Sequence, residues 1–244
     1  MAMVMLMPSL TMAQIKQPAG YARIVADSEA KHLRSRQNLF KILSEHPQFW
    51  PELLAAAERL KTQPAWLLNV MATESLFDPA ARNSLPGQSA SGLLQFVENT
   101  ALRLGTTTTN IRQMNPVQQL LFVEMYFAPF RGRLNSMADI YMAVFRGFIV
   151  DGKGETVISP LSNSRKEQRI YKLNKWLDLN NDQKITKGEL ALAATLIGRF
   201  QPQDPALPRP GRELRPTMHL SSATSDRKPS QTRSIYIRLP KPIK

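Results

Sequence analysis

The sequence contains no cysteine. This excludes a disulfide framework, a thiolate metal site and a cysteine nucleophile, and it suits a cytoplasmic and a periplasmic protein equally well. No run reaches the roughly 18 consecutive apolar residues of a membrane-spanning helix. Strand signals are also sparse, and helical periodicity dominates instead, so the sequence predicts a mostly α fold.

Acidic residues are few, because 32 Lys and Arg stand against 19 Asp and Glu and give a formal net charge of +13. This charge favours an anionic partner such as nucleic acid, a membrane surface or a cell-wall polymer. Residues 201–244, which are rich in proline, hold nine basic and three acidic side chains. We expect a disordered basic tail there, which either stays solvated or binds an anionic cell-envelope surface.

A non-enzymatic protein that binds nucleic acid is the main alternative from another class. The charge allows it, but the basic residues are scattered, and no zinc spacing, RNA-binding signature or recognition-helix pattern is present. The sequence therefore predicts no specific nucleic-acid partner.

The N-terminal part divides into two segments. Residues 1–13 are apolar and end in small residues, which is typical of the end of a secretory signal peptide, although a basic start is missing. Export by this signal-like segment and a plain flexible N-terminus both fit the pattern. Residues 14–46 mix charges with short apolar pieces and are expected to form a partly helical lead-in.

Apolar periodicity and helix breakers predict several helices in the middle of the chain. Prolines at positions 51 and 64 favour helix starts, because a first turn tolerates proline. The predicted helices run over residues 51–60, 64–74, 93–104, 116–127 and 137–148.

Glu74 closes the second of these helices. Leu67, Val70, Met71 and Glu74 fall at i, i+3, i+4 and i+7, so the carboxyl shares the face that packs into the core. Partial desolvation raises the pKa of a carboxyl and keeps some of it protonated near neutral pH. Such a group at the rim of an apolar pocket can protonate a glycosidic oxygen, so we expect Glu74 to be a general acid.

A second motif lies seventeen positions after Glu74. It reads Ser91-Gly92-Leu93-Leu94-Gln95-Phe96, followed by Asn99-Thr100-Ala101. With the Glu74-Ser75 pair it resembles the signature of the soluble lytic murein transglycosylases of the lysozyme-like superfamily. The stretches at 115–120, 126–127 and 141–144 are most similar to the bacteriophage-associated branch of that family. The resemblance covers residues 47 to about 190.

The resemblance implies a lysozyme-like catalytic domain, placed at residues 47–176, that cleaves peptidoglycan as a lytic transglycosylase, a carbon–oxygen lyase. Glu74 would be the sole general acid/base, would need no cofactor, and would leave 1,6-anhydromuramoyl ends at the bond between N-acetylmuramic acid and N-acetylglucosamine. The implied location is the periplasm, the cell envelope or a phage particle. A hydrolytic muramidase in the same cleft is the alternative.

The resemblance also implies a set of substrate-binding residues, each of which has a structural alternative. Ser75 could cap a turn, and Phe96 and Tyr141 could simply pack in the core. Many members have Ala-Tyr-Asn where this chain has Ile140-Tyr141-Met142. The implied substrate-binding residues are Ser75, Ser91, Gly92, Gln95, Phe96 and Tyr141.

Residues 178–189 follow the twelve-residue EF-hand pattern of oxygen ligands. Position six is Gln183, where glycine is usual because the turn favours positive φ. We expect an EF-hand-like segment at residues 177–200, which either holds a structural calcium ion or is stable without metal. The predicted ligands are Asp178, Asn180, Asp182, Lys184 through its backbone carbonyl, Thr186 and Glu189.

Overall fold

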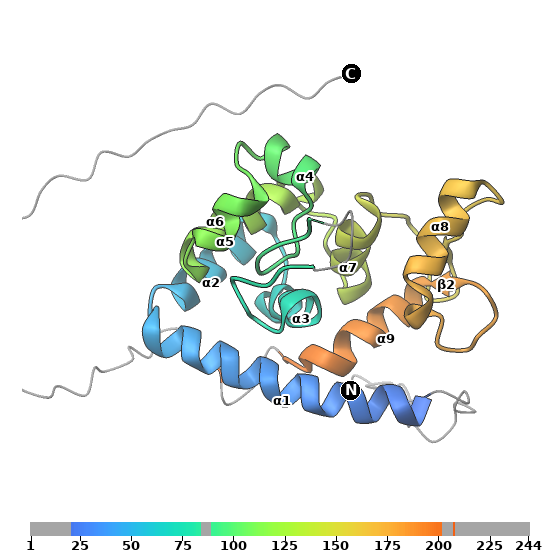
Figure 1. Cartoon of the computed structure of the whole chain (residues 1–244), viewed down its shortest axis with the longest axis horizontal. Helices are drawn as coiled ribbons and strands as arrows, with labels where there is room; N and C mark the ends of the chain where they lie inside the picture. The colour runs from blue at the N-terminus through green and yellow to red at the C-terminus, as the bar shows by residue number, and fades with distance from the viewer. Residues whose placement is uncertain (1–20, 84–88, 202–206, 208–244) are drawn as a thin grey trace, which may run out of the picture. The chain divides into compact units, whose positions relative to one another are not determined.

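The computed structural model of the chain describes residues 21–83, 89–201 and 207 (Figure 1). They belong to one compact unit. The signal-like segment and most of the predicted basic tail lie outside the described residues. The described part is mostly helical, which confirms the predicted fold class.

The elements follow one another in this order. They are α1 (Tyr21–Glu45), α2 (Phe49–Leu60), α3 (Pro64–Ser75), α4 (Glu98–Arg103), α5 (Thr108–Gln113), α6 (Pro116–Phe127), the 3₁₀ turn η2 (Ala128–Phe130), α7 (Met137–Arg146), β1 (Val157–Ser159), α8 (Arg165–Leu173), the 3₁₀ turn η3 (Lys175–Leu177), β2 (Ile185–Thr186) and α9 (Lys187–Gly198).

Local sequence signals set several of the helix ends. Pro64 and Pro116 stand in the first turns of α3 and α6, as predicted. Asn115 and Gln118 form a capping box at the start of α6, in which each side chain accepts a hydrogen bond from the other residue's backbone N–H. Helix α7 ends at Gly147, whose φ of 72° is left-handed, so the helix predicted over residues 137–148 is slightly shorter.

The helix predicted over residues 93–104 is wrong in its first half. Residues 92–95 form a turn in which Gln95 has a φ of 50°, and only α4 is helical. The backbone groups of Ser91 and Phe96 exchange hydrogen bonds of 3.0 and 2.9 Å across this turn. The apolar residues are buried because the turn itself packs into the core, which periodicity alone does not distinguish from a helix.

The sequence analysis also missed α5. No helix is predicted between residues 104 and 116, where four threonines stand at residues 106–109. Instead, Thr107 caps α5 by accepting a hydrogen bond from the backbone N–H of Asn110 at 3.1 Å. Threonine is favoured at such a cap, so a threonine run can begin a helix as well as separate two.

Helix α3 lies in the centre of the core and packs against α2, α7 and α9. It is apolar almost all round, and a helix of that kind is buried on all sides. Its one buried amide, Asn69, donates to the Phe200 carbonyl at 3.0 Å and accepts from the Phe200 N–H at 2.8 Å. The end of α9 is therefore bonded directly to α3.

The described part of the expected lead-in is a single long helix. Helix α1 is continuous from residue 21 to residue 45 and lies along α9 and α2 (Figure 1). Its side chains Leu39 and Ile42 are buried in the core. Glu29 also pairs with Arg199 at 2.7 Å. This helix belongs to the same compact unit as α3.

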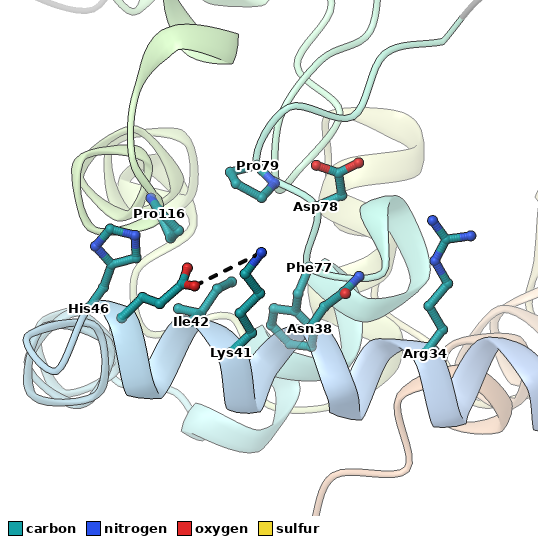
Figure 2. Close-up of a pocket in the computed structure, with 10 residues that line it drawn as sticks. Arg34, Asn38, Lys41, Ile42, His46, Phe77, Asp78, Pro79 and Pro116 are labelled. Carbon is teal, nitrogen blue, oxygen red and sulfur yellow. Dashed lines mark ion pairs between the residues drawn. The ribbon is translucent and has the colours of Figure 1, made fainter.

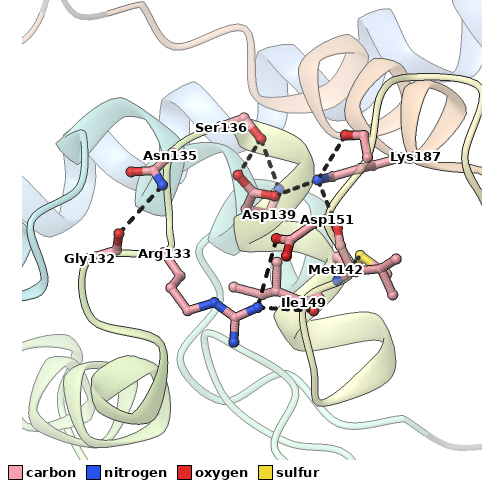
Figure 3. Close-up of polar contacts among 11 residues, drawn as sticks. Gly132, Arg133, Asn135, Ser136, Asp139, Met142, Ile149, Asp151 and Lys187 are labelled. Atoms are coloured by element: carbon pink, nitrogen blue, oxygen red, sulfur yellow. Dashed lines mark hydrogen bonds and ion pairs between the residues drawn. The ribbon is translucent and has the colours of Figure 1, made fainter.

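Helices α7 and α9 are joined by a nearly buried ion pair (Figure 3). The Lys187 Nζ lies 2.7 Å from an Asp139 carboxylate oxygen, and both side chains are only about one-tenth exposed. Ser136 donates its hydroxyl to the same carboxylate at 2.8 Å, and Lys187 donates to the Val150 carbonyl at 3.0 Å. The pair therefore fixes α7 to the helix that follows the predicted calcium loop.

Candidate active site

Glu74 is the last residue but one of α3. Leu76 and Phe77 follow it in the left-handed region, with φ values of 54° and 60°, and they turn the chain sharply away from the helix. Asn38 donates to the Leu76 carbonyl at 2.8 Å, and the Phe77 ring packs edge-on against Phe200. These contacts hold a backbone conformation that non-glycine residues rarely adopt.

The Glu74 side chain is half-buried at the end of α3. Burial raises the pKa of Glu74 from its ordinary value of 4.5 to about 7, as the sequence predicts. Among the described residues, the carboxyl has neither a hydrogen-bond donor nor a cationic partner. A group in this state is poised to exchange a proton near neutral pH.

Two phenols lie near Glu74. Burial, together with the charge of Glu74, raises the pKa of Tyr126 on α6 to about 12. The same two causes raise the pKa of Tyr141 on α7 well above its ordinary value of 10. Both rings are therefore neutral at physiological pH and act as weakly polar walls.

Tyr126 is a site residue that the sequence analysis did not assign, although it singled out the motif. Its hydroxyl donates to the Ala143 carbonyl at 2.7 Å, and its ring packs edge-on against Phe96. A tyrosine at the end of an apolar helix looks like core packing in sequence. Its nearness to Glu74 depends on tertiary packing, which local sequence does not show.

Ser75 is buried directly behind Glu74. Its hydroxyl lies within hydrogen-bond distance of two backbone carbonyls, Met71 at 3.1 Å and Leu93 at 3.0 Å. The Leu93 contact connects the end of α3 to the turn at residues 91–96. The structure thus brings the two halves of the motif together through a backbone carbonyl.

Gln119 holds the same turn from the other side, and its side chain is fully buried. Its Oε1 accepts from the Leu93 N–H at 2.8 Å. Its Nε2 lies 2.8, 2.9 and 3.2 Å from the carbonyl oxygens of Pro79, Ile111 and Met114. The sequence analysis did not assign this residue, because a glutamine within a helix gives no local signal of such a network.

Gly92 is also part of this network, because its lack of a side chain leaves room for the neighbouring side chains. A Cβ at this position would lie 2.5 Å from Ile111 Cγ2 and 2.6 Å from Gln119 Oε1, and φ is 78°. The glycine is therefore required by the packing of two protein side chains and by a left-handed backbone. Its predicted proximity to the substrate stays a prediction.

Gly92→Ala is expected to lower the free energy of unfolding by about 2–4 kcal/mol, because it adds overpacking to a left-handed strain. Gly105→Ala is the matched control, since Gly105 has a φ of 80° and a Cβ added there would meet no atom within 4 Å. The control keeps the strain alone and is expected to lose about 1–2 kcal/mol. Equal losses in urea unfolding would contradict the packing argument.

The other predicted substrate-binding residues fall into two groups. Ser91 and Phe96 are buried, and Ser91 accepts a hydrogen bond from Arg112 at 2.7 Å. Gln95 is only half-buried, and its amide donates to the Gly92 carbonyl at 3.0 Å. Of the residues at the turn, Gln95 is the one with a polar side chain that remains partly accessible.

The first four acids that follow Glu74 in the sequence each have a partner elsewhere. None of these contacts is with Glu74. Their partners are the backbone N–H of Ala80 for Asp78, Thr108 for Glu98, Arg59 for Glu124 and Lys187 for Asp139.

A hollow of about 220 Å³ lies between α1 and the turn that leaves α3 (Figure 2). Its lining carries charges of both signs, Arg34 and Lys41 against Glu45 and Asp78, and Lys41 lies 3.9 Å from Glu45. Glu74 is not among the lining residues. The hollow is therefore not counted as part of the candidate active site.

The predicted calcium loop lies between η3 and α9. Its short strand β2 pairs antiparallel with β1, with Ile185 opposite Ser159. Gln183 at position six has a φ of 68°, which is the positive φ expected for this turn. The glutamine therefore adopts a conformation that glycine would adopt with less strain.

The two acidic ends of this loop are bonded to its backbone. Asp178 accepts from the N–H groups of Asp182 and Gln183 at 3.1 and 3.0 Å, and from the Tyr171 hydroxyl at 2.6 Å. Glu189 accepts from the Leu179 N–H at 2.9 Å. Among the described residues, no three His, Asp or Glu side chains gather closely enough to hold a metal ion.

The remaining predicted ligands stabilise local turns. Asn180 and Asp182 each accept, at 2.9 Å, from the backbone N–H two residues ahead, and the second of these donors belongs to Lys184. Thr186 caps α9 in a capping box with Glu189. These side chains thus stabilise turns within the loop, and the EF-hand assignment and calcium binding both stay predictions.

Comparison with protein families gives one result. Residues 53–144, which include Glu74, the turn at 91–96 and Tyr141, match the family model of the Transglycosylase SLT domain. Neither the curated proteins nor the solved structures yielded a match to the chain. In the described part of the chain, no helix is long and apolar enough to cross a membrane. Over residues 53–144 the chain is therefore similar to transglycosylase SLT domains.

Proposed function

We propose that this chain cleaves the β-1,4 bond between N-acetylmuramic acid and N-acetylglucosamine, with Glu74 as the sole general acid/base. One observation carries the proposal. The Glu74 carboxyl has a pKa raised to about 7 by burial and has no charged partner among the described residues. Near neutral pH it is populated in both protonation states, so it can donate a proton and later accept one.

The reaction needs one carboxyl because the substrate supplies the nucleophile. Protonated Glu74 donates to the glycosidic oxygen, and the bond from that oxygen to muramoyl C1 breaks. The Glu74 carboxylate then accepts the proton of the muramoyl C6 hydroxyl, while O6 forms a bond to C1. The products are an N-acetylglucosamine hydroxyl end and a 1,6-anhydromuramoyl end, and no water is consumed.

A hydrolytic muramidase is the alternative in the same cleft. Hydrolysis with ordinary glycosidase geometry uses a second carboxylate, either to activate water or to attack C1. The contacts of Asp78, Glu98, Glu124 and Asp139 argue against such a second group. The engaged state of these acids therefore favours transglycosylation.

The products of digested sacculi test this choice. We expect mass spectrometry to find muropeptides that end in 1,6-anhydromuramic acid, which are lighter by one water than the hydrolysed forms. Reducing-end muropeptides as the main product would instead establish a muramidase. A protein that binds sacculi but releases neither product would belong to the binding class.

The biological setting belongs to this proposal as well. We propose that the enzyme works at the cell envelope or in a phage particle that passes through murein. The basic residues of 201–244 would bind an anionic envelope surface. This part rests on composition, because almost all of these residues lie outside the described part of the chain.

We also propose that the loop at residues 178–189 binds a structural calcium ion. Its donors are carboxylate, amide and carbonyl oxygens, which suit a hard cation. A carboxylate oxygen that accepts one backbone N–H keeps a further lone pair, so the hydrogen bonds of Asp178 and Glu189 do not exhaust their capacity. No step of the proposed reaction depends on this ion.

Calcium is expected to raise the melting temperature by about 5–10 °C at a concentration one hundred times the dissociation constant. Asp182→Ala should abolish the rise while lowering the metal-free stability by at most about 1 kcal/mol, because Asp182 is exposed and accepts one local hydrogen bond. Magnesium serves as the control cation. A calorimetric titration that shows no heat of binding, together with an unchanged melting temperature, would contradict the calcium proposal.

A further inference from the structure

We infer that Gln119 is a positioning residue for the proposed reaction, because its buried amide holds the turn at residues 91–96 in place beside the end of α3. The inference rests on the proposed function and deepens it. Gln119 contacts no reacting atom. It acts through Leu93, which it joins to Ser75.

The backbone of Leu93 is held at both of its polar groups. Its N–H donates to Gln119 Oε1 at 2.8 Å, and its carbonyl accepts from the Ser75 hydroxyl at 3.0 Å. Ser75 is the residue directly after Glu74. The backbone of this one residue, Leu93, therefore connects α6, which carries Gln119, to the end of α3, which carries the proposed acid.

The amide nitrogen of Gln119 contacts the segment that follows Glu74 in the sequence. Its Nε2 lies 2.8 Å from the Pro79 carbonyl, in the segment that leaves α3, and 2.9 Å from the Ile111 carbonyl at α5. One side chain thus connects the exit of α3, helix α5 and the turn.

Only a residue with both a donor and an acceptor at this length satisfies the site. Oε1 also occupies the space next to Gly92, where a Cβ would approach it to 2.6 Å. Without the amide, the Leu93 N–H and the Pro79 carbonyl would be buried without this partner. Buried backbone groups rarely remain unpaired, so the turn would move or admit water.

Water at this turn would act on Glu74. Its raised pKa has burial as its cause, and the titratable groups that lie near it are the phenols of Tyr126 on α6 and Tyr141 on α7. Both phenols are neutral. No charged side chain of the described residues contributes to the shift, so the proton affinity of Glu74 depends on the exclusion of water.

The test is the pH dependence of sacculus cleavage by Gln119→Met, which keeps the length of the side chain and removes the amide. The alkaline limb reports loss of the proton from Glu74. We expect this limb to move to lower pH by about one unit and the rate near pH 8 to fall about tenfold, because hydration restores a more ordinary carboxyl pKa.

Gln118→Met is the matched control, because Gln118 is the neighbouring glutamine of α6 and its amide oxygen serves the helix cap. Its alkaline limb should coincide with that of the wild type. A Gln119→Met profile that is lowered equally at every pH, with an unmoved limb, would mean loss of folded enzyme alone and would overturn the inference.

If Gln119→Met does not fold, Ser75→Ala provides a second test of the inference. It releases the Leu93 carbonyl and should move the alkaline limb in the same direction by a smaller amount. An unmoved limb in folded Ser75→Ala would then overturn the inference. Failure of the proposed function is distinct, because wild-type protein would release no anhydromuropeptides at any pH.

Discussion

Glu74→Gln is expected to slow the cleavage of peptidoglycan by at least about 10³-fold, toward the upper end of what one general acid/base contributes. The amide has nearly the shape of the carboxyl but neither donates an acidic proton to the leaving oxygen nor accepts the proton of the C6 hydroxyl. Both proposed steps use the same group, so the loss should not be rescued by changing the pH. Release of soluble muropeptides per unit time measures it.

The same substitution should stabilise the folded protein above neutral pH. Folding raises the pKa of Glu74 from 4.5 to about 7, so the folded state holds this proton more tightly than the unfolded state. The associated stability is complete below pH 4.5 and is lost as the pH rises to 7. Glu74→Gln should therefore raise the free energy of unfolding at pH 8 by about 3 kcal/mol and change it little at pH 4.

Glu124→Gln is the matched control for both effects. It makes the same chemical change at an exposed ion pair with Arg59, 2.6 Å apart, and an exposed pair contributes about 0–1 kcal/mol. Its cleavage rate should stay within about twofold of the wild type. Loss of activity in Glu124→Gln, or full activity in Glu74→Gln, would remove Glu74 from the proposed role.

Lys187→Met is expected to lower the free energy of unfolding by about 3–5 kcal/mol, because it leaves the Asp139 carboxylate nearly buried without its cation. The pair spans 2.7 Å between α7 and α9, with side chains about one-tenth exposed. Urea unfolding at pH 7 measures the loss. The double variant Lys187→Met with Asp139→Asn should recover part of it, since no buried charge then remains unpaired.

Arg133→Met is the surface counterpart of this change (Figure 3). Arg133 lies 3.9 Å from Asp151, and both side chains are more than half exposed. Its removal should cost at most about 1 kcal/mol. If Lys187→Met lowered the free energy of unfolding no more than Arg133→Met does, the ion pair between α7 and α9 would not stabilise the fold.

The proposed acid is predictable from sequence because its signals are local. Periodicity places Glu74 on the buried face of a helix, Pro64 marks the start of that helix, and the raised pKa follows from burial. The structure bears out these three expectations. None of them requires knowledge of which distant segment packs against the helix.

The contacts that position this residue depend on tertiary structure. Gln119 and Tyr126 come to the site from α6, which packs against α2, and the turn at 91–96 has apolar residues that look like part of a helix. Likewise, a polar residue in a buried helix, Asn69, finds its partner at Phe200, 131 positions away. The periodicity of the sequence does not reveal contacts between such distant residues.

The most direct test of the central claim is digestion of sacculi in water enriched in ¹⁸O, with wild-type protein, Glu74→Gln and Glu124→Gln compared by mass spectrometry. The mechanism predicts anhydromuropeptides without ¹⁸O from wild type and Glu124→Gln, and almost none from Glu74→Gln. Wild-type products with a reducing end that carries ¹⁸O would contradict transglycosylation. Anhydromuropeptides released at an undiminished rate by Glu74→Gln would contradict its role as the acid/base.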